Sequence, residues 1–188
     1  MNTIVMNLEK NVTAPLFNLK DIFGRTVDLE TYKDKKLLIG FFRHAGCPFC
    51  NLRVHELSKA YLELKSIGFE MIFFFESKEK VILRSSFHLG VSPIPIISDP
   101  EKQWYKTYGL EDSFVKSGVS HITSFVQTLI KAKSQALPFS LPTSGESLGT
   151  LPAEFLIDKN LVIRDLHYSQ RLDDRMEISA IRAFATAP

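Results

Sequence analysis

Cysteine is scarce in this chain. Its 188 residues include only two, Cys47 and Cys50, which are separated by two residues. Small secreted domains held together by disulfides need several spaced cysteines, and this pattern does not resemble their framework. A Cys-x-x-Cys pair is instead typical of redox chemistry or of metal binding. This usage of cysteine predicts a cytoplasmic location.

Long apolar runs and an excess of one charge are also lacking. No stretch approaches the roughly 18 residues that span a bilayer, so we expect no membrane segment. The N-terminal residues lack a basic segment followed by an apolar block, so no signal peptide is expected either. The net charge is only +2, and basic residues are interleaved with acidic ones. This charge pattern gives no reason to expect a nucleic-acid partner.

The remaining composition is that of an ordinary globular protein. Hydrophobic residues make up 45% of the chain and charged residues 23%. A chain of this length and composition can bury the full core of one domain. We therefore expect residues 1–188 to form a single domain.

Segments with strand and helix patterns alternate along the chain. Apolar runs predict buried strands at residues 37–42, 69–75 and 93–97. Apolar residues at helical spacing predict a helix that ends at Gly68, one over 78–87 capped by Ser77, and one over 98–108. This alternation indicates parallel βαβ units and an α/β fold.

Both ends of the chain add further elements. Short β-prone runs at 14–19 and 26–29 predict an N-terminal β-hairpin, and runs at 153–157 and 161–166 predict a second one. A final helix is expected over residues 172–186, covering the sheet.

Residues 110–149 interrupt the alternation. Apolar residues recur on one face of a helix predicted over 115–130, and an irregular loop follows at 136–145. We interpret 110–149 as a helical insertion that packs on the domain before the late strand. A membrane-binding or partner-binding role for its apolar stripe is the alternative.

The two cysteines lie where a predicted strand runs into a helix. A thiol reacts as its thiolate, and the N–H groups at a helix N-terminus stabilise that anion. Pro48 suits the first helical turn, since it lacks an N–H group and has a fixed φ. Two intervening residues leave the second sulfur within reach to resolve a mixed disulfide or a sulfenic acid. We therefore expect Cys47 to be an exposed attacking thiol and Cys50 the buried resolving thiol.

Two residues just before the motif are candidate supporting groups. A positive charge on Arg43 or His44 would lower the pKa of a neighbouring thiol. His44 could also carry protons, and the alternative for His44 is a surface side chain without a role.

The same cysteines could instead bind a metal. A structural zinc site needs four ligands, and the chain has no second Cys-x-x-Cys. None of the histidines shows suitable ligand spacing; they are His44, His55, His88, His121 and His167. We therefore expect no metal. Two inert buried cysteines are a further alternative, which Gly46 and Pro48 beside them disfavour.

Several stretches together resemble the peroxiredoxin-like branch of the thioredoxin-like superfamily, the alkyl hydroperoxide reductase and thiol-specific antioxidant group. These stretches are residues 14–17, 24–29, 41–50, 98–100, 105–110 and 151–160. The resemblance implies a thioredoxin-like fold, with a central mixed sheet flanked by helices. It also implies that Pro152, just before the late strand, forms a cis peptide bond, faces the cysteines and helps to bind the substrate backbone.

The chain departs from the peroxiredoxin pattern at the thiol itself. Peroxiredoxins carry a Pro-x-x-x-Thr-x-x-Cys motif. If Cys50 is the peroxidatic residue, Arg43 and Cys47 stand at the proline and threonine positions, and if Cys47 is, Gly40 and His44 do. The family's arginine before the late strand is also missing, because Pro152 stands there; Arg43 or Arg53 could replace it.

Our leading hypothesis from the sequence is a thiol-based oxidoreductase that reduces peroxides or disulfides through a Cys47–Cys50 disulfide. Such an enzyme needs no metal or organic cofactor, only thioredoxin or a low-molecular-weight thiol as reductant. A homodimer is among the assemblies that the resemblance allows. The alternative is a binding module, in which the insertion docks a partner and redox activity is incidental.

Overall fold

The computed structural model describes residues 7–110, 128, 130–142, 146–147 and 149–188. Its centre is a sheet of five strands in the order β5-β4-β3-β6-β7. β3 (Leu37–Phe42), β4 (Glu70–Phe75) and β5 (Ile96–Ser98) pair in parallel. β6 (Ala153–Ile157) pairs antiparallel with β3, and β7 (Ile163–Tyr168) pairs antiparallel with β6. This mixed sheet, with helices on its faces, confirms the predicted thioredoxin-like α/β fold.

The central strand β3 is buried along its whole length. Leu38 and Phe42 pack into one apolar cluster, while Leu37, Ile39 and Phe41 pack into another on the opposite face. Side chains of a strand alternate between the faces of its sheet, so a strand covered on both sides must be apolar throughout. This is why its sequence is a continuous apolar run.

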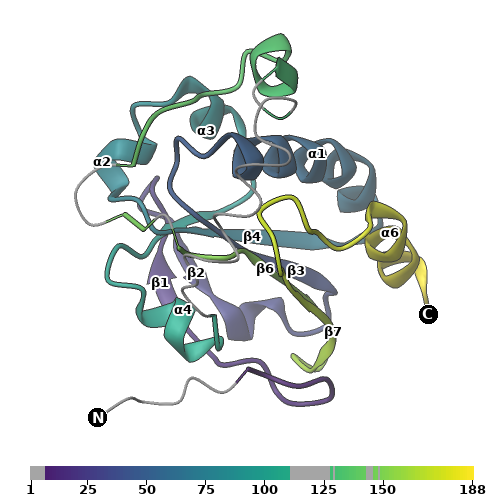
Figure 1. Ribbon diagram of the computed structural model, residues 1–188. Helices are drawn as coiled ribbons and strands as arrows, with labels where there is room; N and C mark the ends of the chain where they lie inside the picture. The colour runs from purple at the N-terminus through teal and green to yellow at the C-terminus, as the bar shows by residue number, and fades with distance from the viewer. Residues whose placement is uncertain (1–6, 111–127, 129, 143–145, 148) are drawn as a thin grey trace.

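Different elements cover the two faces of the sheet (Figure 1). α1 (Pro48–Leu64) and α6 (Ile178–Thr186) lie over one face. The other face is covered by α4 (Gln103–Thr107) and by the N-terminal hairpin of β1 (Asn18–Lys20) and β2 (Thr26–Asp28). This arrangement confirms the predicted hairpin and places α1 directly against the sheet.

Both ends of α1 follow the sequence signals. Pro48 is its first residue, where the missing N–H group costs nothing. A short 3-10 turn, η2 (Lys65–Ile67), continues the helix to Gly68, which has a φ of 82°. Glycine adopts this left-handed conformation at no steric cost, so Gly68 ends the helix as predicted.

Three other predicted helices differ from the structure. In place of the helix predicted over 78–87, the structure has two short helices, α2 (Glu79–Ile82) and α3 (Ser86–Gly90). The residue at the N-cap position of α2 is Lys78, not Ser77. α4 begins only at Gln103, because the Asp99 carboxylate accepts hydrogen bonds from the N–H groups of Gln103 and Trp104. The last helix begins at Ile178, not at residue 172.

Most of the helix predicted over 115–130 lies outside the described residues. Residues 128 and 130–134 are helical, and Ala132 and Leu137 pack against Leu52 of α1. Lys131 also forms an ion pair with Glu56 of α1 at 3.5 Å. Within the described ranges, no helix is both long and apolar enough to cross a membrane.

Candidate active site

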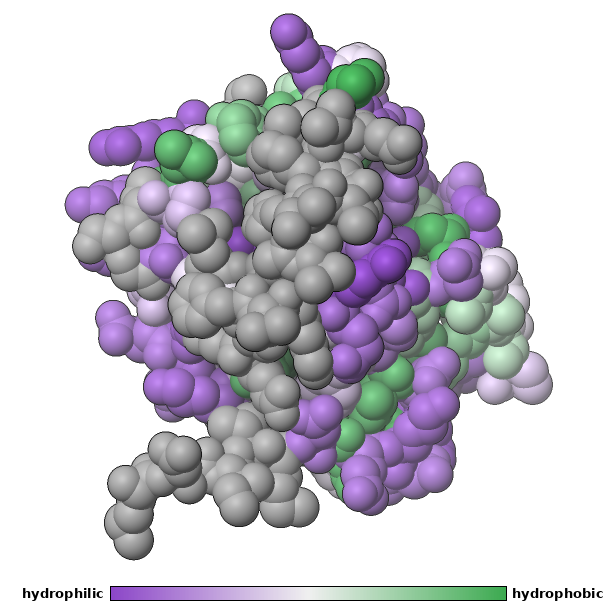
Figure 2. Space-filling view, viewed as in Figure 1, coloured by the Kyte–Doolittle hydropathy of each residue, from purple (hydrophilic) through white to green (hydrophobic). Residues whose placement is uncertain are grey.

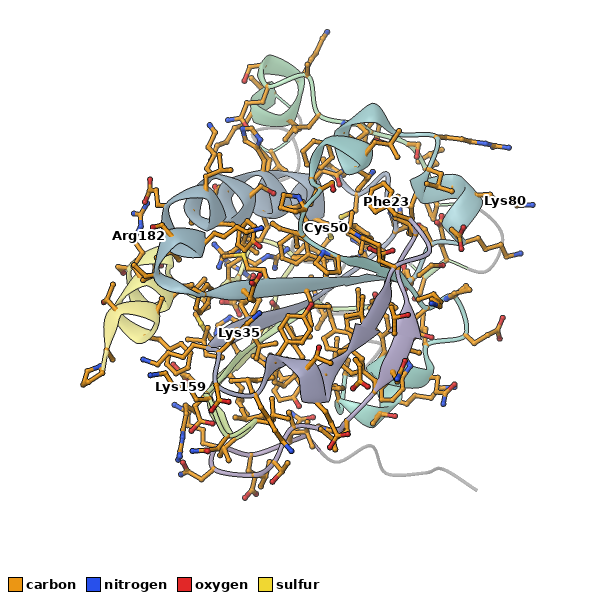
Figure 3. All side chains as sticks on the ribbon, turned by 180° about the vertical axis from the view of Figure 1, so that it is seen from behind. Phe23, Lys35, Cys50, Lys80, Lys159 and Arg182 are labelled. Carbon is orange, nitrogen blue, oxygen red and sulfur yellow. The ribbon has the colours of Figure 1, made fainter. Side chains whose placement is uncertain are left out.

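The Cys-x-x-Cys motif joins the end of β3 to the start of α1. Cys47 is the residue that precedes the first helical turn, and Cys50 lies within that turn. Figure 3 places Cys50 at the end of α1 that is remote from Arg182 and α6. The strand-to-helix placement predicted from the sequence is therefore what the structure has.

Both sulfur-bearing residues are deeply buried. Cys47 is 1% exposed and Cys50 is 0% exposed, and both are present as thiols. They pack in the same apolar cluster as Phe42, Phe49 and Leu151. The prediction of an exposed Cys47 is therefore wrong.

The two thiols have opposite acidities. Burial alone would raise the pKa of Cys47, but a hydrogen bond from the Cys50 thiol and the positive charge of Arg43 lower it to about 6. Burial and the donation of its proton toward Cys47 raise the pKa of Cys50 well above its ordinary value. At neutral pH this pair therefore holds one thiolate, on Cys47, and one thiol, on Cys50.

Arg43 follows β3 and is the charged group in direct contact with the motif. Its Nη1 lies 3.9 Å from the Sγ of Cys47, and its backbone N–H donates to the Sγ of Cys50 at 3.4 Å. The side chain is buried, so water does not screen this charge. The sequence prediction that Arg43 acts on the thiol electrostatically agrees with this geometry.

A second arginine reaches the same thiols from a part of the chain that the sequence did not single out. The charge of Arg175 lowers the pKa of both Cys47 and Cys50. Its Nη1 donates to the carbonyl of Asp174 at 2.6 Å and to the hydroxyl of Ser169 at 3.3 Å, which fixes the guanidinium. Arg175 precedes α6 but lies within the helix predicted over 172–186, and nothing in the local sequence distinguishes it from the other arginines.

Arg53, the other arginine considered from the sequence, has a different role. It is buried on α1 and forms a bidentate ion pair with Glu154 of β6, at 2.7 and 2.8 Å. It also donates to the carbonyl of Met176 at 2.6 Å. Arg53 therefore ties α1 to the sheet and to the segment that carries Arg175, rather than acting at the thiols.

The loop between Arg43 and Cys47 is held by the chain that follows β4. His44 is buried, so the alternative of a surface histidine is wrong, and its carbonyl accepts a hydrogen bond from Cys47. The N–H of Ala45 donates to the Ser77 hydroxyl at 2.8 Å, and this hydroxyl donates to the Glu146 carboxylate. Ser77, predicted as a helix cap, thus supports the loop before the motif.

A buried carboxylate beside Ser77 strengthens this support. Glu76 lies 3.1 Å from the ammonium of Lys102 and accepts hydrogen bonds from the Thr150 hydroxyl and the Ser147 N–H. Burial raises the pKa of Glu76, and the charge of Lys102 opposes that effect. These contacts fasten Ser147 and Thr150 to the end of β4.

The expectation that Pro152 forms a cis peptide bond is wrong. Its peptide bond to Leu151 is trans, and the cis bond found in the described part of the chain is Ser92–Pro93. Pro152 lies just before β6, and its carbonyl accepts a hydrogen bond from Ser169 at 3.0 Å. The antiparallel pairing of β6 with β7 fixes it there, and it is Leu151 that shares the apolar cluster of the cysteines.

No cluster of three or more histidine, cysteine or carboxylate side chains that could hold a metal ion occurs among the residues that the structure describes. His121 lies outside those residues. Cys47 lies near a second thiol and apolar side chains and is acted on by the charges of Arg43 and Arg175, a set suited to thiolate chemistry.

Comparison with known proteins agrees with this fold. Residues 11–166 match the model of the AhpC/TSA family. Over 71 residues the chain is 30% identical to a chloroplastic peroxiredoxin Q of Populus jackii and 31% identical to that of Sedum lineare. Each alignment covers 38% of this chain, and it spans 33% and 38% of the two relatives' length, respectively.

Solved structures with the same fold are distant in sequence. Peroxidoxin BcpB of Mycobacterium tuberculosis superposes with a TM-score of 0.63 at 15% identity, covering 96% of each chain. A mutant form of peroxiredoxin 6 of Arenicola marina gives 0.68 at 12% identity, over 95% of this chain and 72% of that one. A thiol peroxidase of Chromobacterium violaceum gives 0.62 at 18% identity, over 94% and 86%. With the family match across most of its length, this chain belongs to the AhpC/TSA family.

Proposed function

We propose that this protein is a thiol-dependent peroxidase that works through Cys47 and Cys50. One observation carries the proposal: the Cys47 sulfur accepts a hydrogen bond from the Cys50 thiol and lies 3.9 Å from the Arg43 guanidinium. This arrangement provides a stabilised thiolate, a positive charge beside it and a second thiol within reach. Membership of the AhpC/TSA family supports the same chemistry.

The first step is attack of the Cys47 thiolate on one oxygen of the peroxide. The O–O bond breaks as the S–O bond forms, and the second oxygen takes up a proton and leaves as water or an alcohol. Arg43 is positioned to stabilise the negative charge that develops on the departing oxygen. Cys47 is thereby oxidised to a sulfenic acid.

The second step closes the disulfide. The Cys50 sulfur attacks the sulfenic sulfur of Cys47, an S–S bond forms, and the hydroxyl leaves as water with the proton of the Cys50 thiol. The high pKa of Cys50 keeps that proton in place until this step. Since both residues lie at the start of one helix, the sulfurs are already in hydrogen-bond contact.

Regeneration requires two electrons from thioredoxin or from a low-molecular-weight thiol. The thiolate of the reductant attacks the sulfur of Cys47, the Cys47–Cys50 bond breaks, and Cys50 leaves as a thiolate that takes up a proton. A second thiol then releases Cys47. This cycle uses no metal and no organic cofactor. A cytoplasmic location and a homodimer remain predictions, and the curated relatives are chloroplastic proteins.

Reduction of protein disulfides is the competing activity, since the same dithiol could carry it out. Steady-state turnover separates the two: the peroxidase consumes hydrogen peroxide in the presence of a thioredoxin system far faster than a free thiol does. Peroxide consumption no faster than that of free cysteine, together with rapid reduction of a protein disulfide, would favour the disulfide reductase. A Cys47 thiol that titrates near the ordinary value of about 8.5, together with intact cellular function in Cys47→Ser, would favour the binding module.

A further inference from the structure

A short segment of the insertion covers the motif from outside. We call residues 136–142 the strap. In Figure 1 the strap runs from the helical turn at 130–134 across α3 toward α2. It meets the backbone just before Cys47, where the N–H of Ser140 donates to the carbonyl of Gly46 at 3.1 Å. The strap therefore lies over the polypeptide that carries the attacking sulfur.

The side chain of Asn51 joins the strap to the motif. The amide of Asn51, the residue after Cys50, donates to the carbonyl of Pro138 in the strap and to that of Ala45, both at 2.8 Å. Asn51 is buried, so these bonds are shielded from water. The strap is thus held at Pro138 and Ser140, on either side of Phe139.

Gly46 is required by how closely the strap approaches. A Cβ atom at this position would lie 2.0 Å from the Oγ, 2.7 Å from the carbonyl oxygen and 2.8 Å from the nitrogen of Ser140. Two of these three atoms belong to the backbone, so rotation of a side chain cannot relieve the clash. The lack of a side chain at Gly46 is therefore a requirement of the covered state.

The outer side of the strap carries two exposed apolar side chains. Phe139 and Leu141 are 52% and 78% exposed, although both are large apolar residues. A cavity of about 570 Å³ separates this part of the strap from α2 and α3. Figure 2 shows apolar atoms among polar ones on the surface over α2 and α3. Leu137, by contrast, is buried against α1, so the strap has one firm end.

We propose that the strap is a removable cover, which leaves its seat on Gly46 when a protein dithiol reductant reaches the Cys47–Cys50 pair. The reductant's main chain beside its attacking cysteine takes the place of residues 138–140. This inference rests on the proposed function. The groups that bind the strap would also bind such a main chain, since the Gly46 carbonyl accepts a hydrogen bond and the Asn51 side-chain amide donates one. A thiol on a folded protein cannot reach a sulfur that is 1% exposed, and the strap is bonded to Gly46, the residue next to that sulfur.

The test compares two substitutions at one strap position. Ser140→Pro removes the N–H that bonds to Gly46, whereas Ser140→Ala keeps it and removes only the hydroxyl. Alkylation of Cys47 is measured with iodoacetamide and with a polyethylene-glycol maleimide, and mass spectrometry identifies the modified residue. The ratio of the bulky to the small reagent's rate constant reports access, because a change in thiolate population affects both rates.

We expect this ratio to rise about tenfold in Ser140→Pro and to stay at the wild-type value in Ser140→Ala. Gly46→Ala adds a Cβ atom that displaces the strap, so it should raise this ratio as well. Reduction of the oxidised Ser140→Pro protein by thioredoxin should accelerate, while reduction by dithiothreitol stays unchanged. An unchanged ratio in both Ser140→Pro and Gly46→Ala would overturn the proposal. Alkylation requires no peroxidase activity, so this outcome is independent of the proposed function.

Discussion

The Nη1 of Arg43 lies 3.9 Å from the Sγ of Cys47, and both side chains are buried. In a site with little water, a positive charge this close strongly favours the thiolate over the thiol. This contact offsets the cost of burying a charged sulfur.

The reactivity of Cys47 should follow a low pKa. The rate of alkylation by iodoacetamide is expected to rise with pH, with a midpoint of about 6, because the thiolate is the nucleophile. Arg43→Met should move this midpoint upward by about one pH unit or more. Arg84→Met, which changes an exposed arginine, is the control. A wild-type midpoint near the ordinary value of about 8.5 would contradict the account.

Arg175 should act on both sulfurs from a distance. Arg175→Met is expected to raise the pKa of Cys47 and the pKa of Cys50, since its charge lowers both. The pH dependence of alkylation in single-cysteine variants measures each value. Arg171→Met is the matched control, because Arg171 is half exposed and paired with Asp173. Equal effects of the two substitutions would rule out a specific role for Arg175.

The two cysteines should have distinct roles. In Cys50→Ala, peroxide is expected to leave Cys47 as a sulfenic acid that dimedone labels, whereas the wild-type protein proceeds to the disulfide and escapes labelling. In Cys47→Ala, burial still raises the pKa of Cys50, although the part of the shift that Cys47 causes is lost, so Cys50 should be oxidised more slowly at pH 7 than Cys47 is in the wild-type protein. Rapid oxidation of Cys50 in this variant would reverse the assignment.

The ion pair between Arg53 and Glu154 should be a major source of stability. Glu154→Ala leaves a buried guanidinium without its partner and is expected to cost about 3–5 kcal/mol in the free energy of unfolding. Glu63→Ala breaks the pair with Arg182, whose side chains are about half exposed or more, and should cost less than about 1 kcal/mol. Urea denaturation measures both, and similar losses would refute the distinction.

His88 should make the protein sensitive to acid. Burial lowers the pKa of His88 to about 4, and neither ring nitrogen has a hydrogen-bond partner within the described part of the chain. The unfolded chain, with an ordinary pKa of about 6.5, binds this proton more readily, so stability falls as the pH drops from 6.5 toward 4. His88 packs between the rings of Phe75 and Phe87.

His88→Phe should therefore stabilise the protein in acid. The gain from removing the proton site is about 2 kcal/mol at pH 5 and close to zero at pH 7.5. Denaturation at the two pH values measures the difference. His55→Phe is the comparison variant: burial also lowers the pKa of His55, but His55 is more exposed, so its gain in acid should be smaller. A gain that is the same at both pH values would show that packing, not protonation, is responsible.

Local sequence signals were sufficient to predict the frame of the site. The run at residues 37–42, Pro48 and Gly68 each predict a feature of one strand or one helix, and the structure has all three. The Cys-x-x-Cys spacing likewise predicts contact between the sulfurs, because residues in one helical turn stay close whatever the rest of the chain does.

Features that depend on distant segments could not be predicted in this way. Cys47 is buried in an apolar cluster that includes Leu151, more than a hundred residues away in the sequence, and Arg175 acts on it from a segment that precedes α6. The partner of Arg53, Glu154, lies on β6 about a hundred residues further along the chain, so the sequence offered Arg53 only as a candidate arginine for the site. The cis bond expected at Pro152 rests on family resemblance alone, and the structure has a trans proline just before β6.

A single-turnover experiment tests the central claim most directly. Fully reduced protein is mixed with one equivalent of hydrogen peroxide in a stopped-flow instrument, and peptide mapping then identifies the oxidised residues. The account predicts loss of both thiols in one Cys47–Cys50 disulfide per peroxide, at a rate far above that of free cysteine and strongly reduced in Arg43→Met. Oxidation as slow as that of free cysteine, or without a bond between these two residues, would contradict it.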